Sequence, residues 1–235
     1  MGRCALITGA NRGLGRRTAE LLADQGWRVL VGARRRTAGE ETARALRARG
    51  GDAAHVTIDV ADPDSIGTAA RTVREMTEGL DALVNNAGVF LPADLHLSQV
   101  DAEVCARTLC VNAVGPLLVT QAFRPLLRAA CAACVVNVSS SDARPERATG
   151  EHLGYRMSKA ALNTLTANLA VALRPENILV NAVEPGWIPT DMGGPDAPDD
   201  LDEAARLVAR AARLDGAAAD APTGRVFRVG DLEGC

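Results

Sequence analysis

The stretch Thr8-Gly9-Ala10-Asn11-Arg12-Gly13-Leu14-Gly15 follows the short apolar run Cys4-Ala5-Leu6-Ile7 and precedes a helical pattern. Glycines between a first strand and a first helix let the backbone approach a pyrophosphate, which then binds N–H groups at the helix N-terminus. The spacing is GxxxGxG rather than the more general GxGxxG, so a plain turn is the alternative. The stretch favours a dinucleotide site made by Gly9, Asn11, Arg12, Gly13, Leu14 and Gly15.

Short apolar runs alternate with longer helical patterns along the rest of the chain. This alternation is typical of a parallel sheet with crossover helices on both faces. Strands are expected at 4–8, 28–33, 54–58, 81–85, 133–138, 178–183 and 225–229. Helices are expected over 14–25, 38–49, 63–78, 99–130 with a break near 111–115, 155–173 and 200–213. The sequence therefore predicts an α/β fold with a doubly wound, seven-stranded parallel sheet, in a single domain over residues 1–235.

Composition narrows the function classes. The chain has 26 basic and 29 acidic side chains and a net charge of −3, which gives no general attraction for nucleic acid. No run of 18 apolar residues occurs, so we expect a cytoplasmic protein with no membrane partner. Six cysteines are too few for a disulfide framework in 235 residues. Cys131 and Cys134 form a CxxC pair, but zinc needs a second ligand pair and redox chemistry needs a thioredoxin-like setting; we expect no metal.

Two rare residue types lie close together. Of the 26 basic residues only Lys159 is a lysine, and Tyr155 is the one tyrosine of the chain. A spacing of four on a helix puts both side chains on one face, one turn apart.

Basic residues follow the second expected strand, where NAD-binding chains usually place Asp or Glu. The run there is Arg34-Arg35-Arg36. Arg34 and Arg12 could together bind a 2′-phosphate through charge-assisted hydrogen bonds, with a solvated basic turn as the alternative. Asp59 follows the third strand, where it either meets an adenine ring or caps a turn.

Polar residues also follow the later strands. Asn85-Asn86-Ala87-Gly88 ends the fourth strand with small residues that let the chain pass beneath a cofactor. Asn112 lies inside a helix, where Asn is unfavourable, so a specific hydrogen-bonding role is expected. Ser139, Ser140 and Ser141 end the fifth strand at the carboxyl edge, where ligands bind in open α/β sheets; capping is their alternative role.

These motifs, together with Tyr155-x₃-Lys159 and Pro185-Gly186, resemble the short-chain dehydrogenase/reductase family nearly end to end. The resemblance implies a Rossmann fold that binds NAD(P)(H), with Asn112, Ser140, Tyr155 and Lys159 as the catalytic tetrad. Ser140 is chosen because the family's apolar-Asn-apolar-Ser-Ser pattern matches Val136 to Ser140; Ser141 is the choice if the register slips. Beyond the glycine loop, the implied cofactor contacts are Arg34, Asp59, Val60, Asn86, Ala87, Gly88, Tyr155, Lys159, Pro185, Gly186, Ile188 and Thr190.

The chemistry implied by the resemblance suits these side chains. Ser140 would hold a substrate carbonyl oxygen while Tyr155 gives it a proton as hydride arrives. A phenol with a pKa near 10 is a slow acid at neutral pH, so a neighbouring ammonium that lowers the pKa is useful, and Lys159 is that neighbour. By resemblance, Lys159 also binds the nicotinamide ribose, and Asn112 holds a water in the proton relay.

The segment from Pro185 to Pro195 is similar to that of carbonyl reductases within the family, where the backbone at Ile188 and the hydroxyl of Thr190 meet the nicotinamide carboxamide. We therefore expect an NADPH/NADP+-dependent reductase of a ketone or aldehyde of a small organic molecule. Glu184 departs from that subgroup and either faces substrate or is solvated. Only 14 residues separate Ser140 from Tyr155, without the insertion of monomeric members, which favours a homodimer or homotetramer.

Other functions remain open at this point. The same tetrad serves NAD(P)+-dependent alcohol dehydrogenases and reductases of C=N or C=C bonds. A non-catalytic dinucleotide sensor is a further alternative, although a sensor has no need of a proton donor. His152, close to Tyr155, either touches substrate or is solvated.

Overall fold

A parallel sheet forms the centre of the protein, whose computed structural model describes residues 2–214, 216, 218 and 220–232. Seven strands lie in the order β3-β2-β1-β4-β5-β6-β7. They are β1 (Cys4–Thr8), β2 (Arg28–Ala33), β3 (Ala53–Thr57), β4 (Ala82–Asn85), β5 (Ala133–Val138), β6 (Ile178–Glu184) and β7 (Val226–Arg228). Every neighbouring pair is parallel. The expected doubly wound, seven-stranded parallel sheet is confirmed.

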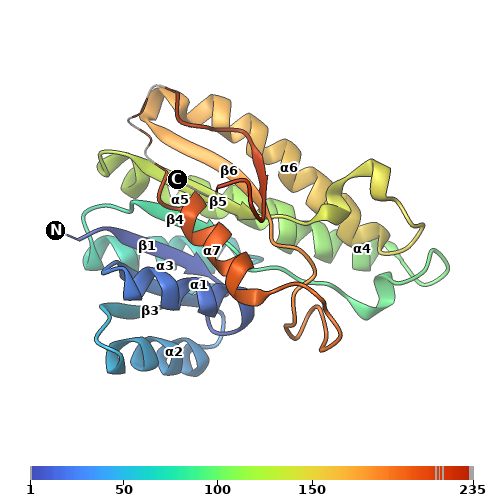
Figure 1. The fold of residues 1–235 in the computed structure, drawn as a ribbon, viewed down its shortest axis with the longest axis horizontal. Coiled ribbons are helices and arrows are strands. Elements are labelled where there is room, and N and C mark those ends of the chain that lie inside the picture. The colour runs from blue at the N-terminus through green and yellow to red at the C-terminus, as the bar shows by residue number, and fades with distance from the viewer. Residues whose placement is uncertain (1, 215, 217, 219, 233–235) are drawn as a thin grey trace.

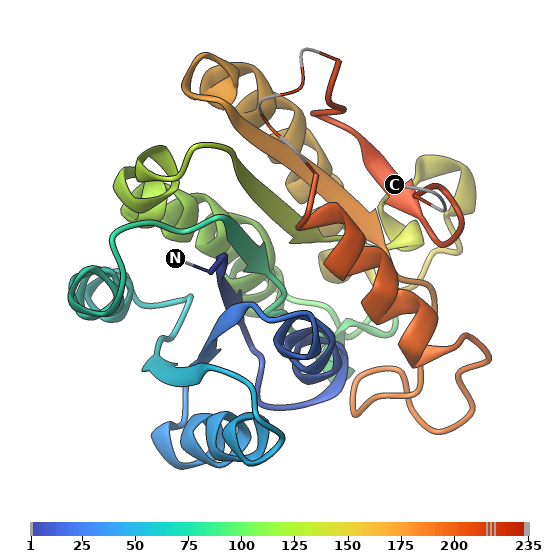
Figure 2. The same cartoon turned by 60° about the vertical axis from the view of Figure 1, so that its left-hand side comes forward.

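Helices cover both faces of this sheet, as Figures 1 and 2 show. One layer comprises α1 (Gly13–Asp24), α2 (Arg36–Ala48) and α7 (Leu201–Ala211). The other comprises α3 (Pro63–Met76), α5 (Gly115–Ala129) and α6 (Leu153–Leu173), and α4 (Ala102–Leu109) precedes α5. Short turns are η1 (Pro92–Asp94), η2 (Cys110–Val114), η3 (Ser141–Ala143), η4 (Pro145–Arg147) and η5 (Arg174–Glu176).

Each face of the sheet has its own apolar core. Side chains alternate along a strand, so Leu30 packs with Leu83 and Phe123 on the α5 face, whereas the next residue, Val31, joins Leu22 on the α1 face. Strands buried on both faces read as continuous apolar runs, and all five residues of β1 are buried. This explains why the strands could be located from the sequence.

The helix expected over 99–130 differs most from the prediction. It begins at Ala102, because the Asp101 side chain accepts a hydrogen bond from the Val104 N–H and so caps α4. The expected break near 111–115 is a π-helical turn, η2, rather than an interruption. Strand ends differ from the prediction by one residue at β3, β4, β6 and β7.

This helical run over 102–129 is long and apolar enough to cross a membrane by length and composition alone. Core helices of globular proteins pass the same test. Val119, Phe123 and Leu127 of this run are fully buried in the core on the α5 face of the sheet. The run therefore forms part of the core in this fold.

The strand order reverses between β1 and β4, which are neighbours in the sheet although two other strands separate them in sequence. Ligands bind in open α/β sheets beyond the carboxyl ends of the strands at such a switch point. The glycine loop after β1 and the Asn86–Gly88 segment after β4 are brought together there.

Candidate active site

The glycine loop has the geometry of a close backbone approach. Gly9 and Gly13 adopt positive φ angles of 67° and 52°, which favour glycine. A Cβ on Gly9 would lie 3.0 Å from the Ala87 Cα, and one on Gly15 would collide with the Asn86 side-chain amide. Gly9 and Gly15 let the loop pack directly against the segment after β4, whereas Gly13 faces Thr190 in the segment after β6.

Asn86 and Thr8 fasten these two segments together. The Asn86 Nδ2 donates to the Thr8 carbonyl at 2.8 Å, and the Thr8 hydroxyl accepts from the N–H groups of Asn86 and Ala87 at 3.0 and 3.1 Å. Asn85 is turned into the protein instead, where its Nδ2 donates to Asn137 Oδ1 at 2.9 Å. These hydrogen bonds hold the glycine loop against the segment after β4 at the expected nucleotide-binding edge.

Helix α1 begins in a way that suits an anion. Its N-cap residue, Arg12, makes no side-chain cap hydrogen bond, and its first turn contains no acidic residue. The first N–H groups of a helix carry partial positive charge and bind phosphate readily. Together with the glycines, this donor set fits the diphosphate of a dinucleotide. Within the loop, Leu14 is buried, and the Asn11 carbonyl accepts a hydrogen bond from the Thr42 hydroxyl.

The residues expected around the adenosine end lie at the carboxyl edge but make local contacts. Arg34 is exposed just after β2, whereas the Arg12 guanidinium forms an ion pair with Asp191. The Asp59 carboxylate accepts from the Ala61 N–H at 3.0 Å, so the turn-capping role that the sequence left open is present. Val60 is buried, and its carbonyl packs against Gly115.

Tyr155, Ser140 and Lys159 come together at the end of β5. The Tyr155 hydroxyl lies beside Ser140, close enough for a side-chain interaction that lowers its pKa, and the Lys159 ammonium lies 5.6 Å from the centroid of the Tyr155 ring. Ser139 is used elsewhere, because its buried hydroxyl donates to Asn163 Oδ1 at 2.6 Å. Ser141 begins the η3 turn. Of the three serines, the geometry brings Ser140 to the tyrosine.

Burial shifts the pKa values of this pair in opposite directions. Tyr155 is half-buried by surface area, but its hydroxyl is surrounded by protein, and the loss of hydration raises its pKa to about 12. The Ser140 hydrogen bond lowers that pKa, and Asp142 raises it. Burial lowers the pKa of Lys159 to about 8. The expected lowering of the tyrosine pKa by Lys159 is therefore not what the structure shows; desolvation dominates instead.

Asn112 has the specific hydrogen bonds that its helical position suggested. It lies in the π-helical turn η2 and is almost fully buried. Its Oδ1 accepts from the Val89 N–H at 2.8 Å, and its Nδ2 donates to the Val89 carbonyl at 2.9 Å and to the Ser158 hydroxyl at 3.0 Å. Asn112 thus joins the segment after Gly88 to the helix that carries Tyr155.

The segment after β6 lies over the glycine loop. Pro185 is buried, and Gly186 has a φ of 87° beside the Asp199 carboxylate. Ile188 is buried as well, and the Thr190 Cγ2 lies 3.3 Å from where a Cβ on Gly13 would be. The segment after β6, expected to meet the nicotinamide, therefore packs against the glycine loop at Gly13.

Glu184 is neither solvated nor loosely held. Its side chain is only 4% exposed and its Oε2 lies 3.1 Å from Arg144 Nη2 and 3.4 Å from Arg228 Nε. Its strand neighbour in β7 is Arg228, and Arg144 follows the η3 turn. The alternative of a solvated Glu184 was wrong, because two cations surround the carboxylate.

His152 is similarly withdrawn from solvent. Its side chain is 22% exposed, and its ring lies 4.8 Å from the ring of Phe90. Its buried Nδ1 has no hydrogen-bond partner among the residues that the structure describes.

Sequence reasoning missed three features of this edge: the Arg12–Asp191 pair, the Arg144–Glu184–Arg228 cluster and Asp94, whose buried carboxylate binds the first turn of α6. Nothing local in the sequence marks these partners, which lie 40 to 179 positions apart. A signal existed for Glu184 alone, as a charged residue at the end of an otherwise apolar strand.

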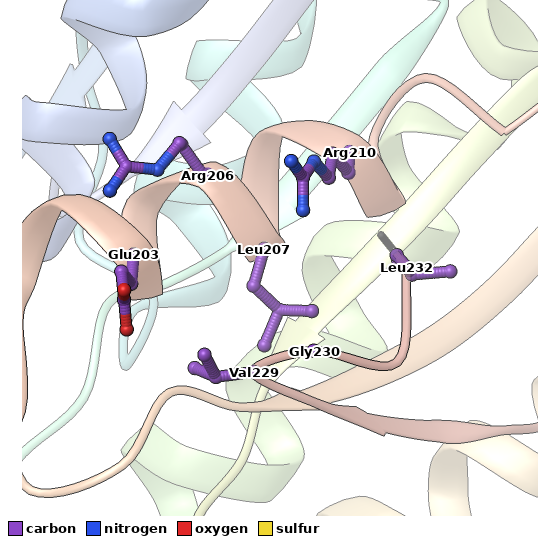
Figure 3. Close-up of a pocket in the computed structure, with 7 residues that line it drawn as sticks. All are labelled: Glu203, Arg206, Leu207, Arg210, Val229, Gly230 and Leu232. Carbon is purple, nitrogen blue, oxygen red and sulfur yellow. The ribbon is translucent and has the colours of Figure 1, made fainter. Parts of the chain in front are cut away.

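The remaining candidate sites are a cavity beside α7, possible groups of metal ligands and the CxxC pair. A cavity of about 70 Å³ lies between α7 and the turn after β7, lined by Glu203, Arg206, Leu207, Arg210, Val229, Gly230 and Leu232, none of them an expected site residue (Figure 3). Within residues 2–214, 216, 218 and 220–232, no group of three His, Cys, Asp or Glu side chains could hold a metal. Cys134 of the CxxC pair donates to the Leu214 carbonyl at 2.9 Å, and Cys131 is exposed.

Comparison with known proteins identifies the family. The family model described as short chain dehydrogenase matches residues 3–200. The chain belongs to the short-chain dehydrogenase family.

Relatives within the short-chain dehydrogenase family include several reductases. The chain is 37% identical over 201 residues to the 3-oxoacyl-(acyl-carrier-protein) reductase FabG of Aquifex aeolicus, covering 81% of this chain and 76% of FabG. It is 36% identical over 221 residues to the short-chain dehydrogenase anuI of Penicillium roqueforti, covering 88% and 87%. A crystal structure of NADPH-bound carbonyl reductase from chicken fatty liver has a TM-score of 0.83 and 30% identity, covering 97% of this chain and 96% of that one. Short-chain dehydrogenases are oxidoreductases that use NAD(P) cofactors, and this chain carries the fold and the glycine loop for one.

Proposed function

We propose that this short-chain dehydrogenase reduces a ketone or aldehyde of a small organic molecule to an alcohol, with NADPH as its cofactor. The placement of Ser140 beside the Tyr155 hydroxyl, with Lys159 one helical turn away, carries the proposal. This group lies at the carboxyl edge of the sheet, beside the segments that fit a dinucleotide.

Tyr155 has the protonation state that a proton donor needs. Because burial raises its pKa to about 12, the phenol stays protonated at neutral pH. Ser140 donates a hydrogen bond to the substrate carbonyl oxygen and so holds that oxygen against the Tyr155 hydroxyl. NADPH, when bound, supplies the hydride. Tyr155 gives its proton to the same oxygen as negative charge develops on it.

Lys159 and Asn112 complete the proposed tetrad. With a pKa of about 8, Lys159 remains mostly an ammonium at neutral pH, and it is placed to hold ribose hydroxyls and to stabilise negative charge on the phenol. Asn112 Oδ1 accepts one hydrogen bond, from Val89, and a carbonyl oxygen has two lone pairs. The second lone pair can hold a water for the proton relay.

A preference for NADPH over NADH rests on the end of β2. The residues there are Arg34, Arg35 and Arg36, so no carboxylate is available for an adenosine ribose. Arg34 is exposed and Arg12 lies on the adjoining glycine loop, which suits a 2′-phosphate. The 30% identical carbonyl reductase from chicken fatty liver was solved with NADPH bound, which supports the same choice.

The remaining cofactor contacts follow the segments described above. We assign them to Gly9, Asn11, Gly13, Leu14, Gly15, Asp59, Val60, Asn86, Ala87, Gly88, Pro185, Gly186, Ile188 and Thr190.

We further propose a cytoplasmic homodimer or homotetramer. Val114 of η2 and Met157 and Val171 of α6 are large, exposed apolar side chains, which a surface that meets another copy would require. Light scattering of the purified protein measures the assembly.

The test is NADPH consumption, followed by its absorbance, with para-nitrobenzaldehyde, menadione and a set of aliphatic ketones, and with product identification by chromatography. Formation of alcohol with NADPH supports the proposal. Turnover only of alcohols with NADP+, or only of C=N or C=C substrates, would replace it with one of the other reactions that the tetrad serves. Tight NADPH binding with no turnover on any substrate would favour a sensor.

A further inference from the structure

Asp94 is a fully buried carboxylate in a segment that otherwise faces solvent. It ends the η1 turn between β4 and α4 and is 0% exposed, whereas Leu95 and Leu97 are 39% and 74% exposed. Its Oδ1 accepts from the Gly154 N–H at 2.7 Å and its Oδ2 from the Tyr155 N–H at 2.6 Å. A buried charge is retained at a cost unless it is hydrogen-bonded, and these two donors are on the helix that carries Tyr155.

Helix α6 has no cap of its own. Its N-cap residue, His152, adopts a left-handed conformation with φ of 58° and makes no side-chain cap hydrogen bond, and the first turn has no acidic residue. The N–H groups of Gly154 and Tyr155 occupy the second and third helical positions, which an N-cap side chain normally satisfies. Asp94 supplies this cap from 60 residues earlier in the chain, and its negative charge suits the positive end of the helix.

Further contacts tie the same segment to the active site. The Phe90 ring meets the Tyr155 ring edge-on, with centroids 5.3 Å apart. Residue His96 forms an isolated antiparallel bridge with Glu151, just before α6. The Asp94 cap therefore stands in the middle of a segment that contacts Tyr155 at both its backbone and its ring.

We propose that Asp94 is a positioning residue for the reaction, holding the first turn of α6 so that the Tyr155 hydroxyl stays against Ser140. The inference rests on the proposed function, because it assigns the effect to Tyr155 as proton donor. Without the cap, the first turn frays, since two of its N–H groups lose their acceptors. A displacement of about 1 Å at a reacting group is enough to cost about 100-fold in rate.

The main test compares Asp94→Ala, which removes both acceptors, with Asp94→Asn, which keeps one. We expect Asp94→Ala to lower kcat about tenfold or more on the best carbonyl substrate, with KM and the Kd for NADPH within about threefold of wild type. The kcat of Asp94→Asn should lie between that of Asp94→Ala and that of wild type. The matched control is Asp62→Ala, which removes the side-chain cap of α3. In wild type the Asp62 carboxylate accepts a hydrogen bond from the Asp64 N–H at 3.0 Å, and its loss should leave kcat within about twofold of wild type.

Gly154→Ala disturbs the same contact from the other side. A Cβ at position 154 would lie 3.2 Å from Asp94 Oδ1 and 3.3 Å from Oδ2, so the carboxylate must shift. Gly154→Ala alone should lower kcat several-fold, whereas adding it to Asp94→Ala should cost little more, because the clashing group is absent. Additive losses of kcat across this double-mutant cycle would contradict the inference.

A measurement without substrate covers the case in which a variant is poorly folded or inactive. Amide hydrogen exchange at Gly154 and Tyr155 should be about tenfold faster in Asp94→Ala, which removes both acceptors, than in wild type, while exchange in α3 is unchanged. Unchanged amide exchange would overturn the positioning role of Asp94. So would a wild-type kcat in both Asp94→Ala and Gly154→Ala while Tyr155→Phe is inactive, and that result would leave the proposed function intact. Wild-type turnover in Tyr155→Phe would instead overturn the proposed function.

Discussion

Lys159 donates a hydrogen bond from its ammonium to the Val138 carbonyl oxygen at the end of β5, with Nζ and O 2.7 Å apart. The ammonium is almost fully buried, and this desolvation lowers its pKa from 10.5 to about 8. The contact fixes the lone lysine of the chain directly beneath the strand end that carries Ser140. It also makes the stability of the protein depend on pH in a defined direction.

The first prediction concerns that dependence. Between about pH 8 and 10.5 the unfolded state binds more protons at Lys159 than the folded state, so the free energy of unfolding rises with pH. The unfavourable contribution of the buried ammonium is fully present below about pH 8 and has disappeared by about pH 10.5. The free energy of unfolding of Lys159→Met, taken relative to wild type, should therefore be most favourable at neutral pH. This difference should shrink by about 3 kcal/mol as the pH rises to 10.5.

Urea unfolding of wild type and Lys159→Met at a series of pH values provides the measurement. The lost bond to Val138 adds an offset that does not vary with pH, so the change in the difference is diagnostic. Tyr155 acts in a separate window: its raised pKa stabilises the fold below about pH 10, and that stability is lost as pH rises toward 12. A difference between the two proteins that stays constant from pH 7 to 10.5 would contradict a buried, charged Lys159.

Arg34 is predicted to set the cofactor preference. Arg34→Asp should lower the ratio of kcat/KM for NADPH to that for NADH by about tenfold or more, because a charge that binds phosphate becomes one that repels it. Arg44→Asp makes the same charge change at an exposed position of α2 and should leave the ratio nearly unchanged. Equal shifts in the two variants would mean that net charge alone is responsible.

Asp191 is predicted to compete with NADPH for Arg12. Both partners of that ion pair are more than two-thirds exposed, at 68% and 71%, so breaking it should change stability very little. Asp191→Asn should tighten NADPH binding about two- to fivefold and NADH binding less, because Arg12 is released and a negative charge is removed. Fluorescence titration at low salt measures both constants. Weaker NADPH binding in Asp191→Asn would argue that the pair helps to form the site.

The sheet and the order of its elements could be predicted because the relevant signals are local. The buried strands β1, β5 and β6 are mainly apolar runs, with one Asn inside each of β5 and β6. They end at a glycine turn, at serines and at Glu184-Pro185. Tyr155 and Lys159 could be placed together because they share one helix, and Asn112 stood out because Asn is unfavourable inside another; their proposed role as a tetrad with Ser140 comes from the family resemblance. Helix starts were harder, since α6 begins at Leu153 under a cap that comes from Asp94.

The long-range polar contacts could not be predicted from the sequence. No periodicity connects Arg12 with Asp191, or Arg144 with Glu184, because their partnership depends on how loops from different strands meet at one edge. The pKa of Tyr155 differs from the expectation for a related reason: the spacing of Tyr155 and Lys159 indicates a nearby charge but not the burial of the hydroxyl, which has the larger effect.

Glu184 is predicted to stabilise the fold through its two arginines. Glu184→Gln leaves Arg144, 22% exposed, beside a neutral amide and should lower the free energy of unfolding by roughly 1–3 kcal/mol. Glu176 is a matched control at the other end of β6, since it too contacts two arginines, Arg124 and Arg128, which are 50% and 62% exposed. Glu176→Gln should cost only about 0–1 kcal/mol. Equal losses in urea unfolding would show that the burial of Glu184 does not matter.

Tyr155→Phe tests the proposed catalytic role most directly, because it deletes the hydroxyl beside Ser140 and leaves the ring in place. The measurement is kcat for NADPH-dependent reduction of the best carbonyl substrate, with NADPH binding determined separately by fluorescence. We predict a loss in kcat of about 100-fold or more with the Kd for NADPH within a few-fold of wild type, because only the proton donor is removed. A Tyr155→Phe enzyme that turns over within a few-fold of wild type would contradict the assignment of Tyr155 as the proton donor.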